Sequence, residues 1–352
     1  MSFLHFALDG TGAGVILRAL AECCNAKSAP NVTGMAITTA SVAENEINLR
    51  NQISSWSCRC NTEVTIQSLG LATPFFDPNI TSEQWAAMEA AMSSGVKTRR
   101  FTFSPEKIAL LKQTCSSKFL QHLSPSGFIS SNDIVTAILG ITVDMAQDPS
   151  KTRRMNDENA RLTLTVDLRS RVQPPLPGTF VGNMNYPAYC EIRHLVQDQR
   201  PEPLQEDNKE EEADLLALSQ LALQLRGKLS SMNESLAYSV SATVADLEDW
   251  SKIESKPGNV IVTTWRHLDS YTLDFGDCLG KIVDFDAGLS LIPRACIIMP
   301  AREKAPREEG EGKEKAETET ETETVPWEVN ITMKLEDMDV LVGDPLLARI
   351  LA

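Results

Sequence analysis

Short segments with the two-residue alternation of strands lie between longer segments with helical spacing, and this order constrains the fold more than any other feature. We expect strands at 3–8, 98–103, 161–166, 260–265, 291–299 and 327–333, and helices at 15–24, 38–55, 105–115, 134–145, 215–229 and 335–351. Strands and helices alternate here without the uniform period of repeated βαβ units. The sequence therefore predicts an α/β protein whose layers form two unequal parts.

Two of the expected helices have clear start signals. Ser104 precedes Pro105 and Glu106, which is the order of a capping serine, a proline at the first helical position and an acid in the first turn. Ser131-Asn132-Asp133 similarly opens the helix expected at 134–145.

Two acidic segments account for most of the net charge of −15. Residues 202–214 contain seven acids against one base, and residues 302–324 contain nine acids against five bases. The Glu-Thr repeat at 317–324 is of low complexity and cannot form a packed core. We therefore expect 199–213 and 302–325 to be exposed, disordered insertions. The remaining chain has no basic stripe of the kind that binds nucleic acid.

The chain has the composition expected of a cytoplasmic protein. It contains no apolar run near the roughly 20 residues that span a bilayer. Its first residues, MSFLHFALDGTGAG, lack the basic region of a secretory signal and reach Asp9 before an apolar stretch could form. The eight cysteines lack zinc-site spacing, so we expect reduced thiols and no metal.

The sequence His5-Phe-Ala-Leu-Asp9-Gly10 is the first candidate for chemistry. A histidine at the end of a strand, followed by an acid and a glycine turn, can place its imidazole beside a substrate. Its pKa near neutrality suits a general base. By itself the pattern also fits a surface histidine beside a turn.

Two further groups of charged residues accompany this motif. An Asp-Phe-Gly triplet occupies 274–276, without the glycine-rich loop or catalytic loop that a protein kinase requires. Arg169 and Arg171 alternate after an expected strand, so both could point to one side. A buried arginine needs an anionic partner, and Asp9 and Asp274 are the candidates.

In this order the three elements resemble the BAHD acyl-CoA-dependent acyltransferases, particularly the fungal trichothecene O-acetyltransferase-like branch. That family has a His-x-x-x-Asp-Gly motif and an Asp-Phe-Gly-x-Gly-like motif. In this chain Asp277-Cys278-Leu279 replaces the usual Trp-Gly pair after the second motif. Further local resemblances cover Phe103–Ile108, Ser131–Asp133, Val166–Arg171, Pro174–Pro177, Val181–Asn183, Thr263–Arg266 and Leu291–Pro293.

The resemblance implies acyl transfer, in the first place acetyl transfer, from acyl-CoA to a hydroxyl group of a small specialised metabolite. His5 would be the general base, with Asp9 as its motif partner. Thr263 and Trp265 correspond to positions implicated in oxyanion stabilisation in some family members. Acyl-CoA would be a co-substrate, with no tightly bound cofactor, in a monomeric enzyme. The residues that contact CoA cannot be assigned from the sequence.

The remaining motif residues would be structural. The resemblance implies that Asp9 pairs with Arg171 and that Asp274 pairs with Arg169. Gly10 and Gly276 would form the turns of the two motifs.

The family fold is the two-domain fold of chloramphenicol acetyltransferase. The resemblance divides this chain into part of an N-terminal domain at 1–75, a crossover at 76–125 and a C-terminal domain at 126–352, with 274–300 returning to the N-terminal domain. Family members have on the order of a hundred or more residues before the histidine motif. We therefore expect an incomplete N-terminal domain, one channel wall missing, and weak or no turnover.

Three alternatives compete with this interpretation. A dinucleotide site would use Gly10-x-Gly12-x-Gly14, but the third fingerprint position is Val15 or Leu17. Peptide-synthetase condensation domains share the histidine motif but lack the Asp-Phe-Gly element. An inactive remnant, or a non-catalytic binding protein of the same fold, stays open.

Overall fold

The structure is a computed structural model. It describes residues 9–28, 39–56, 81, 83, 90, 95–124, 127–147, 160–192, 209–245, 258–287, 292–302 and 325–352. The strand expected at 3–8 lies outside these ranges, as do residues 199–208 and 303–324 of the acidic segments.

Helices and strands alternate along the described chain, as the sequence predicts. The helices are α1 (Gly10–Ser28), α2 (Thr39–Ser54), α5 (Pro105–Cys115), α6 (Gln121–Leu123), α7 (Ser131–Ala146), α8 (Lys209–Ser231), α9 (Glu234–Ala245), α11 (Leu335–Val342) and α12 (Pro345–Ala348). The strands are β1 (Val96–Phe103), β2 (Arg161–Asp167), β3 (Asn185–Glu191), β4 (Val260–Thr264), β5 (Ala295–Ile298) and β6 (Trp327–Lys334).

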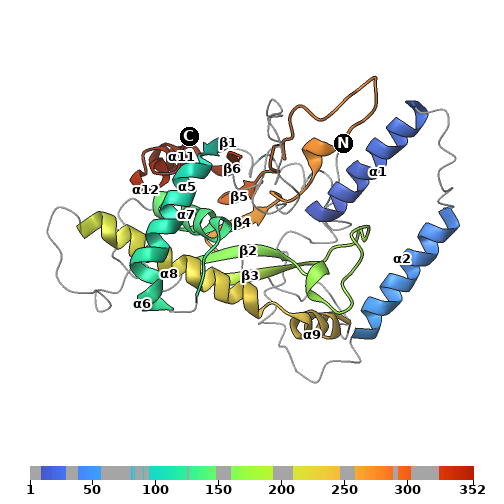
Figure 1. Ribbon diagram of the computed structural model, residues 1–352, viewed down its shortest axis with the longest axis horizontal. Helices are drawn as coiled ribbons and strands as arrows, with labels where there is room; N and C mark the ends of the chain where they lie inside the picture. Colours follow the sequence, from blue (N-terminus) through green and yellow to red (C-terminus); the bar gives the residue numbers. More distant parts are fainter. Residues whose placement is uncertain are drawn as a thin grey trace, which may run out of the picture.

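The strands form one mixed six-stranded sheet in the order β1-β6-β5-β4-β2-β3 (Figure 1). Strands β2, β4 and β5 are parallel neighbours, with Leu162 beside Val260 and Ile261 beside Ala295. The remaining pairs are antiparallel, and β1 pairs with β6 along its whole length. Strand β5 thus lies within this sheet, while the domain boundaries expected from the resemblance stay a prediction.

Helix α7 is the centre of the hydrophobic core. Fourteen of its sixteen residues are buried, as expected for a helix that is covered on all sides. It packs against β4, and helices α5, α8, α11 and α12 all contact it. A Cβ atom at Gly140 would lie 3.1 Å from a methyl group of Leu162, so glycine at this position permits the close approach of α7 to β2.

The predicted start of α5 is confirmed, whereas α7 begins at Ser131, three residues before the predicted 134. The Ser104 hydroxyl accepts a hydrogen bond from the Lys107 N–H at the start of α5. The capping residue of α7 is Ser130, whose hydroxyl accepts from the Asp133 N–H while the Asp133 carboxylate accepts from the Ser130 N–H. Strand β3 and helix α9 were not expected from the sequence.

Two expectations were wrong in detail. The residues after Asp9 do not form a separate turn, because α1 begins directly at Gly10. Both expected disordered insertions extend too far into the fold. Residues 209–213 form the first turn of α8, and Ala213 packs against the core, while Val325, the last residue of the second insertion, is buried. The apolar face of α8 begins at Leu215, and the helix continues from there toward its N-terminus through the acidic residues.

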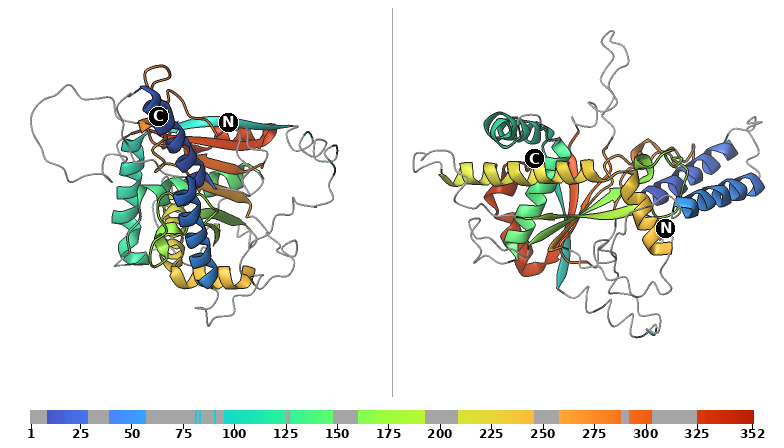
Figure 2. Two further views of the ribbon diagram at one scale, coloured as in Figure 1. Left: turned by 90° about the vertical axis from the view of Figure 1, so that its right-hand side faces the viewer. Right: turned by 90° about the horizontal axis from the view of Figure 1, so that it is seen from below.

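Helices α1 and α2 lie at the opposite end of the molecule from α5, α11 and α12 (Figures 1 and 2). Among the described residues, no helix is both long and apolar enough to cross a membrane.

Candidate active site

The start of α1 meets the carboxyl ends of two parallel strands, β2 and β4. The Thr11 hydroxyl donates to the carboxylate of Asp167, the last residue of β2, over 3.0 Å. Gly10 lies against the indole of Trp265, the first residue after β4. Ligands of open α/β sheets commonly bind beyond the carboxyl ends of parallel strands. This junction is therefore the candidate active site.

Asp9 is the buried anchor of the junction, with a relative exposure of 1%. One carboxylate oxygen accepts a hydrogen bond from the Gly12 N–H at 2.9 Å, which caps the N-terminus of α1. The other accepts from the Met184 N–H at 3.0 Å. Arg169 donates from both terminal nitrogens, one to each oxygen, at 2.9 Å. Such a bidentate pair fixes direction as well as distance.

Arg169 connects this carboxylate to the segment before β3. Its guanidinium also donates to the carbonyl oxygens of Gly182 at 2.6 Å and Phe180 at 3.3 Å. It lies 5.7 Å from the centroid of the Phe180 ring and 3.1 Å from an oxygen of Asp167. The side chain of Arg169 is only 6% exposed, so this contact set supplies the anionic partners that a buried arginine requires.

The environment of Asp9 keeps it ionised. Burial by itself would raise the pKa of its carboxyl group. The hydrogen bond from Arg169, the N–H groups of Met184 and Gly12, and the positive charge of Arg169 together outweigh burial and hold that pKa below its usual value. The junction therefore contains a permanent ion pair at neutral pH.

The predicted pairing of the two arginines was wrong. Arg169 pairs with Asp9, whereas Arg171 donates to the carbonyl oxygens of Leu229 and Met232, at and just beyond the end of α8. The strand ends at Asp167, and residues 169–171 form a 3₁₀ turn. Residues two apart in such a turn point in different directions, unlike residues two apart in a strand.

Asp274 is exposed and makes no ion pair with Arg169. Its carboxylate accepts from the Gly276 N–H at 2.9 Å within a tight turn. Gly276 and Gly280 both have positive φ in that turn, which explains the spacing of the glycines in the second motif. The Asp274 carbonyl accepts from the Asn25 side chain, so the motif contacts α1 through its backbone.

Thr263 and Trp265 come from β4 and its continuation. Val260 and Val262 are buried in the core, whereas Thr263 is half-buried. By strand alternation Thr263 lies on the other face of the sheet. Trp265 extends the ladder with an N–H bond to the Ile298 carbonyl. A Cβ atom on Gly10 would lie 2.5 Å from the indole Nε1, so the indole occupies the space that a side chain at position 10 would fill.

The predicted base, His5, lies outside the described residues, as does the segment before Asp9. The structure thus brings together Asp9, Gly10, Arg169 and Trp265. The sequence analysis did not identify the Met184 N–H as a partner of Asp9. The only signal for it is that Met184 directly follows Val181–Asn183, one of the local resemblances to the family. In the described part of the chain, no group of three or more histidine, cysteine or acidic residues could hold a metal ion.

The sequence of this chain matches a family model and several curated fungal proteins. The Transferase family model matches residues 1–304. The fumigaclavine B O-acetyltransferase of Penicillium roqueforti (strain FM164) is 28% identical over 99% of this chain and 68% of its own length. The communesin N16 acyltransferase of Penicillium expansum is 27% identical over 98% of this chain and 67% of its own length.

The fold also matches solved structures. The F. graminearum TRI101 complex with coenzyme A and deoxynivalenol has a TM-score of 0.64 at 16% identity, over 98% of this chain and 64% of that chain. This likeness shows that the described chain has the mixed α/β fold of these acyltransferases, as predicted. The chain spans about two thirds of the length of the relatives it matches.

Proposed function

Because this chain belongs to the Transferase family, the BAHD acyltransferases, we propose that it transfers an acyl group, in the first place acetyl, from acyl-CoA to a hydroxyl group of a small specialised metabolite. The observation that carries this proposal is the bidentate pair of Asp9 and Arg169. It anchors Asp9, four residues after His5 in the sequence, and the start of α1 at the carboxyl ends of β2 and β4. The relatives' names, a fumigaclavine B O-acetyltransferase among them, support the substrate class.

In this mechanism His5 removes the proton from the acceptor hydroxyl. The hydroxyl oxygen attacks the thioester carbonyl carbon, and a tetrahedral oxyanion forms. The oxyanion collapses, the C–S bond breaks, and CoA leaves as the thiol once the protonated His5 returns its proton. Thr263 and Trp265 are the proposed neighbours of the oxyanion, where stabilisation of the developing charge usually contributes most. Asp9 acts indirectly, because both of its oxygens are engaged by Arg169 and backbone N–H groups.

The proposed enzyme is a cytoplasmic monomer that uses acyl-CoA as a co-substrate and needs no tightly bound cofactor. The acidic balance of the chain, −15, gives no reason to expect a nucleic-acid partner.

The test follows thiol release from acetyl-CoA with a panel of alcohol acceptors. It uses this chain and a form extended at its N-terminus by the corresponding segment of the Penicillium roqueforti relative. His5→Ala should lower acceptor-dependent release by about 10² to 10⁴-fold. The matched control is His122→Ala, because His122 is exposed on α6, far from α1 (Figure 1). Full release by the His5 variant would refute the mechanism. No release from either form would favour the alternative, a non-catalytic binding protein of this fold.

A further inference from the structure

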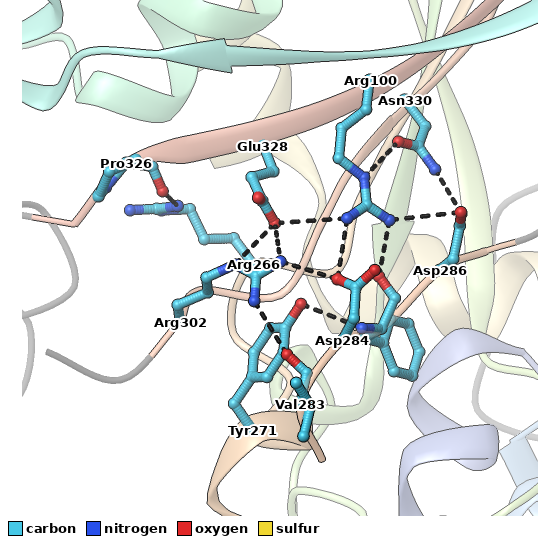
Figure 3. Close-up of polar contacts among 11 residues, drawn as sticks. Arg100, Arg266, Tyr271, Val283, Asp284, Asp286, Arg302, Pro326, Glu328 and Asn330 are labelled. Atoms are coloured by element: carbon cyan, nitrogen blue, oxygen red, sulfur yellow. Dashed lines mark hydrogen bonds and ion pairs between the residues drawn. The ribbon is translucent and has the colours of Figure 1, made fainter. Parts of the chain in front are cut away.

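Five charged residues form a cluster where β1 and β6 meet the segments before and after β5 (Figure 3). This charged cluster consists of Arg100 on β1, Glu328 on β6, and Asp284, Asp286 and Arg302. Asp284 lies 2.9 Å from Arg100 and 2.7 Å from Arg302, and Glu328 lies 3.1 Å from Arg302. Several charges thus share partners, and such a network holds its geometry better than an isolated surface pair.

The charged cluster holds the backbone of residues 283–285. Arg100 donates to the Phe285 carbonyl at 3.0 Å, and Arg302 donates to the Val283 carbonyl at 3.1 Å. The Phe285 N–H in turn donates to the Tyr271 hydroxyl at 3.2 Å. The position of the Phe285 backbone is therefore fixed from both sides.

Phe285 connects the charged cluster to the candidate active site. Its ring meets the Trp265 indole edge to face, with centroids 6.1 Å apart and an interplanar angle of 78°. The Nε1 end of the same indole lies against Gly10, directly after the buried Asp9. Trp265 thus lies against both Phe285 and the first residue of α1.

We propose that the charged cluster is a remote positioning device for Trp265, with Arg100 and Asp284 acting through Phe285. This inference rests on the proposed function for the catalytic consequence, because Trp265 is a proposed neighbour of the oxyanion. A side chain next to a developing charge must be held within a fraction of an ångström, and contacts outside the site can supply that order.

The charge states of the cluster favour ion pairs that persist across neutral pH. Burial would lower the pKa of Arg100 and Arg302, but the neighbouring carboxylates raise both above the usual value. The hydrogen bonds from Arg100 and Arg302 hold the pKa of Asp284 below its usual value. All three groups stay charged across neutral pH.

The first test reads Trp265 directly and needs no activity. Emission spectra are recorded for each variant with and without Trp265→Phe, so that the difference isolates this indole. Arg100→Gln should shift the Trp265 emission to longer wavelength and raise its quenching by iodide. Arg349→Gln is the matched control, because it breaks the 2.7 Å pair with Glu211, which also joins half-exposed side chains. An unchanged difference spectrum in a cooperatively folded Arg100→Gln variant overturns the proposal.

Asp284→Asn supplies a second variant in case the arginine substitution prevents folding. It removes one charge from the cluster and keeps an oxygen acceptor, and the same spectral shift is expected in smaller degree. In the thiol-release assay both variants should lose kcat by about tenfold with little change in KM, within the roughly 10²-fold that a 1 Å misplacement can cost. A spectral shift, together with no turnover in either this chain or its N-terminally extended form, would support the positioning and contradict only the proposed function. A spectral shift with unchanged kcat would overturn the catalytic part of the inference.

Discussion

At the scale of single residues, the Asp9–Arg169 pair dominates the candidate site. Both side chains are almost fully buried, and each carboxylate oxygen receives at least two hydrogen bonds. Two buried charges are tolerated when every partner is satisfied, and loss of one partner leaves the other charge buried alone. The pair therefore affects the free energy of unfolding mainly through the buried charge that loses its partner when the other residue is replaced.

We expect Asp9→Asn to lower the free energy of unfolding by about 3–5 kcal/mol, because Arg169 loses its buried, bidentate carboxylate partner and keeps only the partly exposed Asp167. Urea denaturation measures this change. Asp274→Asn is the matched control, since Asp274 belongs to the second motif and is exposed. Its effect should stay within about 0.5 kcal/mol. Equal losses in the two variants would contradict the assignment of Asp9 as the buried partner.

The pair also predicts an acid dependence. The pKa of Asp9 is lowered in the folded chain from the usual 3.8. A group with a lowered folded pKa stabilises the fold above its unfolded pKa, and this contribution is lost as the pH falls through the folded pKa. Between about pH 5 and pH 2 the free energy of unfolding should therefore fall less steeply in Asp9→Asn than in the unmodified protein. Parallel curves from urea denaturation across this range would show that Asp9 is not the group responsible.

At the scale of elements, side chains from distant segments complete the ends of helices. Asp9 caps the start of α1. Arg171 binds the carbonyl oxygens of Leu229 and Met232 at the end of α8, where a cation also opposes the helix dipole. Burial lowers the pKa of Arg171, and the charge of Arg226 lowers it further, while Asp167 acts in the opposite direction.

Arg171→Ala should therefore loosen the end of α8. The loss of two charge-assisted hydrogen bonds should cost roughly 1.5–3 kcal/mol. Hydrogen exchange should speed up in the last turn of α8 before the rest of the helix. Lys228→Ala, an exposed change in the same turn, is the control and should alter exchange far less. Uniform acceleration across the sheet would mean that Arg171 supports the whole fold instead.

At the scale of the whole molecule, the acidic segment between β5 and β6 joins two strands that are already neighbours. Ile298 pairs with Val329 across these strands. Arg266 accepts from the Ala301 N–H through its carbonyl and donates to the Val325 carbonyl. Both ends of the connection are therefore held at one place.

Replacement of 303–324 by a short Gly-Ser linker should preserve the fold. A shorter loop costs less closure entropy, about 0.6 kcal/mol for each halving of its length, so the melting temperature should stay the same or rise slightly. Thermal unfolding followed by circular dichroism checks this. A marked fall in the melting temperature would show that the segment packs against the fold.

Local features of this protein follow from its amino-acid sequence alone. Strands β1, β2, β4 and β6 and helices α5, α7 and α8 follow from periodicity and capping, because each depends on residues a few positions apart. The motifs around Asp9 and Asp274 also indicated the family that the comparison then showed.

The three-dimensional arrangement of the chain sets which distant groups meet. It paired Asp9 with Arg169 instead of Arg171, left Asp274 exposed, and brought both Phe285 and Gly10 against Trp265. Periodicity states which face of a segment is buried, but it does not state which partner lies opposite that face. Asp9 and Arg169 are 160 residues apart, and a single 3₁₀ turn after β2 decided which arginine reached the carboxylate.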